Sequence, residues 1–156
     1  MKNLLLTAMT FSIAVGSASI VHSRVEEVRS DLQCLAMNIY HEARGEPEEG
    51  QIGVAYVTLN RMNHWNWPDN ICEVVWQPHQ FSWTTDNIDN TPRDTERYEA
   101  AMAVAREVYL NREEDPTNGA VFYHANWVNP SWANYSSVNE SWRLGVHIFY
   151  TWSGTW

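Results

Sequence analysis

The stretch YHEARGEP, residues 40–47, decides how the chain folds, because it places a carboxylate where a helix must end. Upstream of it, apolar residues recur at helical spacing and predict an amphipathic helix over 31–44. Gly45 is expected to cap that helix, and Pro47 disfavours helical angles at the residue before it. Glu42 then lies in the last turn, at the negative end of the helix dipole. A carboxyl group there keeps its proton more readily than one in water, as a general acid requires.

The rest of the chain predicts a single α+β domain that is mainly helical, with a small sheet. Its 156 residues are enough for one hydrophobic core. Hydrophobic periodicity, turn residues and an N-capping Asp94 define the segments. The expected elements are further helices over 48–62, 71–76 and 94–112, and extended segments over 120–124 and 146–152.

Residues 1–23 predict a targeting segment. Lys2, the apolar run 4–15 and the small residues 16–18 give the three parts of a secretory signal. A retained signal-anchor is the alternative, because 4–21 is marginally long enough to span a bilayer, and it would allow transient membrane contact. Residues 24–30 are then a charged lead-in, and 31–156 form the domain. We expect an exported protein of the periplasm or cell envelope, with a released phage lysis protein as the alternative.

The charge balance argues against nucleic acid as a partner. The formal net charge is −9, and Lys2 is the only lysine, so cleavage of the targeting segment leaves nine arginines against 19 acidic residues. Binding to a nucleic acid needs a basic surface that displaces counterions. The sequence does not indicate an oligomeric state, and we expect a monomer.

Cys34 and Cys72 are the only cysteines. In an exported protein an even pair favours a disulfide, which would link the 31–44 helix to the 71–76 segment. On a chain-entropy estimate such a link contributes about 3 to 4 kcal/mol to stability. Two buried free thiols are the alternative.

Ordered sequence blocks cover nearly all of residues 31–152. They are CLAMNIYHEARGE (34–46), GQIGVAYVTLNR (50–61), ICEVVWQ (71–77), QFSW (80–83), YHA (123–125), PSWA (130–133) and GVHIFY (145–150). Together they resemble the SleB-type cell wall hydrolase domain. The resemblance implies a lysozyme-like core, no cofactor, and cleavage of peptidoglycan glycan strands with Glu42 as the essential acid. Similar domains occur in spore-cortex-lytic enzymes, which look like lytic transglycosylases, in Gram-negative envelope proteins and in phages.

The resemblance also implies roles for other residues. Apart from the resemblance, the position of Glu46 at the turn predicts a structural role, either holding Arg44 or capping the helix over 48–62. Many envelope relatives have a second cysteine pair around the QFSW block, where this chain has His79 and Thr85. The expected substrate-binding residues are Gln80, Phe81, Ser82, Trp83, Tyr123, His124 and Trp132.

Nine tryptophans in a chain of this size call for an explanation. Flat aromatic faces stack on sugar C–H surfaces, so the tryptophans in loop-like segments suit a glycan groove, although aromatic packing is the commoner use. We expect Trp83, Trp127 and Trp132 in the groove, and Trp76, Trp142 and Trp152 in the core.

Two other functions are alternatives to glycan cleavage. A metal-dependent wall amidase or peptidase would need a ligand motif, but Gly45 stands where a zincin helix beginning at His41 would place its second histidine. No metal is therefore expected, and His147, among apolar residues, is expected to be a hydrogen-bonded core histidine. A module that binds glycan without cleaving it is the second alternative.

Overall fold

The computed structural model describes residues 12–85, 89–111 and 115–154. Lys2 and the first part of the predicted apolar run lie outside these residues. The described residues divide into two units, one on each side of the boundary between Ser30 and Asp31. Within the described residues, no helix combines the length and hydrophobicity needed to span a membrane.

Helix α1 runs from Ser12 to Ala43 and ends one residue before the predicted boundary. The predicted start at residue 31 is wrong, because residues 24–30 are helical as well. Their side chains are exposed, so they carry no core-facing pattern that could have revealed the helix. Glu26 and Arg29 are three residues apart, a spacing at which opposite charges stabilise a helix locally.

Gly45 does not cap α1 in the way expected. Its φ is not positive, unlike that of Gly119 and Gly145. The helix is instead closed by a tight turn, in which the Glu46 N–H donates to the Ala43 carbonyl at 2.9 Å. The Arg44 guanidinium adds a bond to the Tyr40 carbonyl at 3.1 Å.

Helix α2 (Glu48–Met62) is the centre of the 31–156 unit, and its predicted bounds are confirmed. It is buried on most of its surface, and it contacts α3 (Ile71–Trp76), α4 (Thr95–Leu110) and the first strand. α4 begins as predicted, with the Asp94 carboxylate accepting from the Arg97 N–H at 3.1 Å. Arg112, the predicted end of that helix, lies outside the described residues.

The predicted disulfide is confirmed. Cys34 of α1 and Cys72 of α3 are bonded with an S–S distance of 2.10 Å, and they enclose a sequence separation of 38 residues. The bond therefore holds two helices that no short loop connects.

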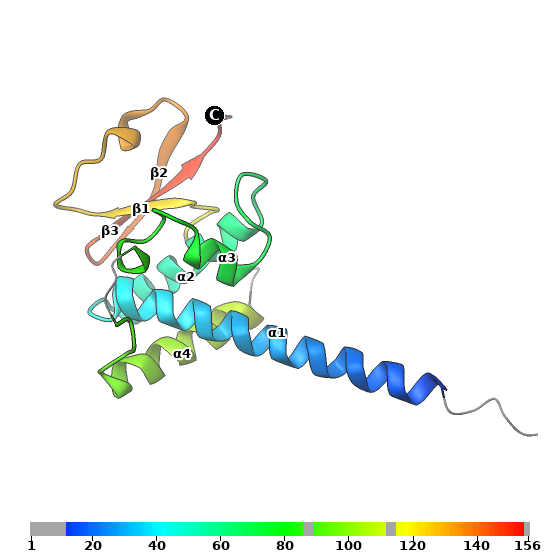
Figure 1. The fold of residues 1–156 in the computed structure, drawn as a ribbon. Coiled ribbons are helices and arrows are strands. Elements are labelled where there is room, and N and C mark those ends of the chain that lie inside the picture. The colour runs from blue at the N-terminus through cyan, green and yellow to red at the C-terminus, as the bar shows by residue number, and fades with distance from the viewer. Residues whose placement is uncertain (1–11, 86–88, 112–114, 155–156) are drawn as a thin grey trace, which may run out of the picture. The chain divides into compact units, whose positions relative to one another are not determined.

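The sheet has three antiparallel strands in the order β1-β3-β2. β1 (Phe122–Ala125) overlaps the predicted segment 120–124 and runs one residue beyond it, and β3 (His147–Trp152) falls in the predicted segment 146–152. β2 (Val138–Leu144) was not predicted. Figure 1 shows the sheet to one side of the helices. Its inner face approaches α2 so closely that a Cβ at Gly53 would meet the Phe149 ring at 2.5 Å. The predicted class, α+β and mainly helical, is confirmed.

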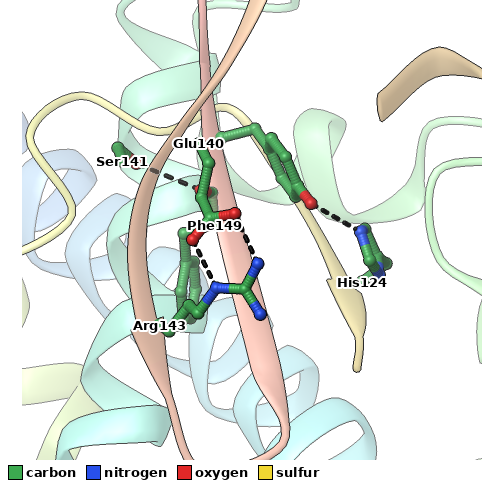
Figure 2. Close-up of polar contacts among 6 residues, drawn as sticks. His124, Glu140, Ser141, Arg143 and Phe149 are labelled. Atoms are coloured by element: carbon green, nitrogen blue, oxygen red, sulfur yellow. Dashed lines mark hydrogen bonds and ion pairs between the residues drawn. The ribbon is translucent and has the colours of Figure 1, made fainter. Parts of the chain in front are cut away.

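The outer face of the sheet has its own polar contacts (Figure 2). β2 is irregular between Glu140 and Trp142, and there the Ser141 hydroxyl donates to the Phe149 carbonyl at 3.3 Å. Glu140 and Arg143 form an ion pair through both carboxylate oxygens. Because this pair is exposed, it contributes little to stability.

A buried amide joins α1 to α2 and to the segment after α3. The Asn38 side chain donates to the Thr58 hydroxyl at 3.1 Å and accepts from the Trp83 indole N–H at 3.2 Å. Asn38 and Thr58 are fully buried, so these bonds satisfy groups that water does not reach.

Candidate active site

An open cavity of about 760 Å³ lies at the end of α1. Its size is that of a typical ligand pocket. α1 and the following turn form one wall, and Arg61, the 80–82 segment, β1 and the β2–β3 hairpin form the others. The lining residues are His41, Glu42, Ala43, Arg44, Gly45, Glu46, Arg61, Gln80, Phe81, Ser82, Tyr123, His124, Ala125, Trp127, Val128, Val146 and His147.

Glu42 is partly buried in this cavity. Its Oε2 accepts a hydrogen bond from the Tyr123 hydroxyl at 3.0 Å. Burial raises the pKa of Glu42, while the bond from Tyr123 and the charge of Arg61 act in the opposite direction. The pKa of Tyr123 is raised well above its ordinary value, by burial and then by the neighbouring Glu42, so its hydroxyl stays a donor. A carboxyl group with a raised pKa in an open cavity can deliver a proton.

Arg61 is the cavity residue that the sequence analysis missed. Its side chain is only 5% exposed, and its Nε donates to the Val121 carbonyl at 2.7 Å. Burial lowers the pKa of Arg61 to about 10, against the opposing effects of Tyr123 and Glu42, so the guanidinium is charged at neutral pH. One signal was available: it is the last residue of the 50–61 block and a cation on an otherwise buried helix.

Glu46 has a different partner from the two expected. Its Oε2 accepts from the Val146 N–H at 2.8 Å, and its carbonyl accepts from the Gln51 side chain at 3.1 Å. Pro47 is the N-cap of α2 and no side chain caps that helix. Within the described residues Glu46 forms no ion pair with Arg44. Glu46 therefore attaches the β2–β3 hairpin to the turn after α1.

The QFSW block divides between the cavity and the core. Gln80, Phe81 and Ser82 line the cavity, although Phe81 is nearly fully buried. Trp83 is 8% exposed and does not line it; its ring stacks on His41 at 4.4 Å, and its indole N–H is bonded to Asn38. A partner for the indole N–H inside the protein explains why Trp83 is buried.

The loop around this block holds its shape without a second cysteine pair. Ser82–Thr84 form a short 3-10 helix, η1. The Thr84 hydroxyl donates to the Phe81 carbonyl at 2.9 Å, and the Thr85 hydroxyl to the Ser82 carbonyl at 2.8 Å. His79 begins the loop with a φ of 67°, a value uncommon for a residue with a side chain.

His124 lines the cavity with both ring nitrogens engaged. Nδ1 lies 2.9 Å from the Ala125 carbonyl, which can only accept, so Nδ1 carries the proton. Nε2 then accepts from the Tyr150 hydroxyl at 2.9 Å when the ring is neutral (Figure 2). The ring is therefore fixed, and it stacks on the Tyr150 ring at 5.2 Å and meets the Trp132 ring edge to face at 5.6 Å, on the outer face of the sheet.

The other tryptophans also depart in part from expectation. Trp132 lies in η2 (Ser131–Asn134) and packs on the outer face of the sheet, 5.2 Å from the Phe122 ring, rather than lining the cavity. Trp127 does line it and is 72% exposed. Trp76, expected in the core, is 47% exposed, whereas Trp142 packs against Phe149.

Two further histidines line the cavity. His41 faces the Asn90 carbonyl at 3.0 Å, and burial lowers its pKa. His147 is buried as expected, but its Nδ1 has no hydrogen-bond partner, and burial lowers its pKa against the charge of Glu46. In the described part of the chain no three His, Cys, Asp or Glu side chains are grouped as metal ligands would be.

The fold and the cavity define a class of protein: an α+β domain that presents one carboxyl group of raised pKa in an open cleft. Residues 45–150 match the family described as Cell Wall Hydrolase, and the chain belongs to that family. The resemblance noted in the sequence is thereby confirmed.

Curated relatives are spore cortex-lytic enzymes. That of Halalkalibacterium halodurans is 37% identical over 124 residues, which are 77% of this chain and 34% of the relative. That of Bacillus subtilis is 34% identical over 126 residues, 77% of this chain and 37% of the relative. The chain thus spans little more than a third of the length of these relatives.

Two solved structures have a similar fold. The catalytic domain of the Bacillus cereus SleB protein has a TM-score of 0.61 and 27% identity, over 78% of this chain and 89% of that one. The catalytic domain of the germination-specific lytic transglycosylase SleB from Bacillus anthracis has a TM-score of 0.63 and 30% identity, over 76% and 92% of the two chains.

Proposed function

We propose that this protein cleaves peptidoglycan glycan strands at the bond between N-acetylmuramic acid and N-acetylglucosamine, as a lytic transglycosylase with Glu42 as its single acid and base. The observation that carries the proposal is Glu42 itself, a carboxyl group of raised pKa, bonded to Tyr123 and facing an open cavity. The similar domain from Bacillus anthracis, described as a lytic transglycosylase, supports the reaction type.

The reaction uses one carboxyl group twice, first as an acid and then as a base. Glu42 first donates its proton to the glycosidic oxygen as the bond from that oxygen to the muramic acid C1 breaks, so the glucosamine leaves with a hydroxyl group. The ionised Glu42 then takes the proton of the muramic acid C6 hydroxyl. The C6 oxygen attacks C1 and closes a 1,6-anhydro ring, which returns Glu42 to its acid form without consuming water.

Glu46, the other carboxylate in the cavity, is engaged in a structural hydrogen bond, and this supports a reaction with a single catalytic acid. Among the lining residues only Glu42 and Glu46 carry carboxyl groups. Glu46 already accepts the Val146 N–H, and losing that bond would leave the hairpin without its attachment. A second catalytic carboxylate, as in two-acid glycosidases, would therefore have to come from elsewhere.

We assign substrate contacts to the lining residues whose polar or aromatic groups face the cavity. Gln80 and Ser82 provide hydrogen-bonding groups, and the exposed Trp127 provides a flat surface for a sugar ring. His124 is not assigned a hydrogen bond to substrate, because both of its ring nitrogens are engaged, with Ala125 and Tyr150. We reassign Tyr123 from substrate binding to holding Glu42, because its hydroxyl is already engaged there. We further propose that the protein acts outside the cytoplasm, as a monomer.

The deciding experiment compares Glu42→Gln with Glu46→Gln on purified peptidoglycan. We expect the first variant to release fragments about 10²–10⁴-fold more slowly, and the second to retain the chemistry while it stays folded. Mass spectra of fragments from the unaltered protein should show 1,6-anhydro ends. Reducing ends would identify a hydrolase instead, and full activity of Glu42→Gln would remove Glu42 as the acid.

The two rival functions give different results. A metal-dependent amidase or peptidase would lose activity in EDTA and regain it with zinc, and it would release peptides rather than sugars. A glycan-binding module would sediment with peptidoglycan yet release nothing from it.

A further inference from the structure

We propose that Arg61 is a positioning residue that stabilises the negative charge of Glu42 in the interval between its two proton transfers. This role rests on the proposed one-acid mechanism. In that mechanism Glu42 must be neutral to give its proton and must then remain an anion until the C6 hydroxyl replaces it. A partly buried carboxylate needs a compensating positive charge during that interval.

The placement of Arg61 fits this role. It lines the same cavity as Glu42 but belongs to α2, so it reaches the site from another direction. Its Nε is fixed by the Val121 carbonyl, and its guanidinium lies 5.2 Å from the Phe81 ring centre and 5.9 Å from that of Trp67. The charge is thus held in a set position.

The guanidinium also has an unused donor. Its Nη1 is buried and has no hydrogen-bond partner, which is costly for a charged group. In the described part of the chain Arg61 forms no ion pair with Glu42, so its charge acts on Glu42 through space in this state. The Arg61 guanidinium therefore has a charged donor to spare, in the same cavity as a carboxyl group that is ionised for only part of the reaction. Such a donor can stabilise the negative charge on Glu42 while that charge lasts.

The other charged and titratable groups do not supply this compensation. Tyr123 of β1 donates one hydrogen bond to Glu42 but is neutral. His41 of α1 and His147 of β3 both have lowered pKa values and are therefore neutral at pH 7. Arg44 is exposed and bonded to the Tyr40 carbonyl. Glu46 accepts from Val146 and cannot offset a negative charge. Both ring nitrogens of His124 are engaged, with Ala125 and Tyr150, so neither is available to Glu42.

A purely structural role for Arg61 is the competing explanation, since its bond to Val121 and its two aromatic contacts stabilise the core. The two roles differ in the pH dependence of activity. Arg61 holds the pKa of Glu42 down, so removing its charge should raise that pKa further. Because Glu42 must be protonated to act, the alkaline limb of kcat/KM should then move to higher pH.

The test uses Arg61→Gln, Arg61→Lys and, as a control for the loss of one positive charge, Arg106→Gln on the exposed surface of α4. For Arg61→Gln we expect kcat to fall by about 10²–10³-fold, as when a donor to a developing charge is removed, with the alkaline limb shifted upward. Arg61→Lys should keep the limb in place, and Arg106→Gln should match the unaltered protein. A lower rate with an unmoved limb in Arg61→Gln would overturn the proposal.

A measurement on the unaltered protein covers the case in which Arg61 variants do not fold. The guanidinium N–H signals of Arg61 should shift in NMR spectra over the same pH range in which the Glu42 carboxyl carbon titrates, and they should not shift in Glu42→Gln. The proposal would be overturned if the Arg61 N–H signals did not shift while Glu42 titrates. This readout needs no activity, so it separates failure of this inference from failure of Glu42 as the acid.

Discussion

The last turn of α1 and the turn that follows it each present one glutamate to the same cavity, with opposite consequences. Glu42 accepts from a side-chain hydroxyl of β1, while Glu46 accepts from a backbone N–H of the β2–β3 hairpin. A hydroxyl can rotate and follow changes in the charge of its partner, whereas a backbone N–H is fixed in place. Four residues of sequence thus separate a group suited to exchanging protons from one suited to holding a loop.

The largest expected effect is the loss of activity when Glu42, rather than Glu46, is replaced. Glu42→Gln should lower the rate of fragment release by about 10²–10⁴-fold, because loss of a general acid has that size of effect. Glu46→Gln should lower it far less. The measurement is the initial rate on purified peptidoglycan, with circular dichroism to show that both variants are folded. Equal losses in the two variants would remove the distinction between the residues.

Removing the disulfide tests whether the stability of the fold and the acid–base behaviour of Glu42 are independent of each other. Cys34→Ser should lower the free energy of unfolding by about 4 kcal/mol, since the closed loop spans 38 residues. Urea unfolding measures this loss, and Cys72→Ser with the double variant should give the same value. The alkaline limb of activity should stay where it is, because neither sulfur lines the cavity. A displaced limb would mean that the bond also sets the environment of Glu42.

Gly145→Ala tests the contact made by Glu46. Gly145 has a φ of +56°, and an added Cβ would collide with the Glu46 carboxylate. Gly119 is the matched control, with a φ of +83° and no atom within 4 Å of an added Cβ. Each alanine should cost about 1 kcal/mol in backbone strain, and Gly145→Ala should cost about 1–3 kcal/mol in total because it also displaces Glu46. Equal costs in thermal unfolding would show that the Glu46 contact contributes nothing.

The smallest effect concerns stability and pH. Burial raises the pKa of Glu42, so the folded state binds its proton more tightly than the unfolded state does. Stability should therefore fall as the pH rises from the ordinary glutamate pKa through the raised value, and level off above it. Glu42→Gln should flatten that part of the curve and should be the more stable protein at neutral pH. A curve of the same slope in both proteins would contradict this account.

The sequence was sufficient where local chemistry decides the structure. α2 and α3 have their predicted bounds, Asp94 caps α4, and the cysteine pair is bonded. Helical periodicity, capping side chains and cysteine count are all read within one segment or from composition. The position of Glu42 at the end of α1 followed from the same reasoning, helped by the family blocks.

The missed features depend on contacts between distant segments. β2 is largely polar and partly exposed, and it is a strand because β3 pairs with it. Trp83, expected in the groove, is buried because its indole N–H has a partner inside the protein, Asn38. Trp76, expected in the core, is exposed and does not line the cavity. Arg61 is part of the site because Val121 and two aromatic rings surround it, and its neighbours in the sequence do not reveal that.

The buried Asn38 amide has a consequence for the accuracy of the site. Asn38 precedes Glu42 by about one helical turn on α1, and its two ends are bonded to Thr58 and to Trp83. Sliding α1 by a single residue would move Glu42 by about 1.5 Å and turn it by about 100°. That slip would leave buried polar atoms unpaired, at about 1–3 kcal/mol each. A side chain that never meets the substrate thus fixes the depth and the direction from which the acid enters the cleft.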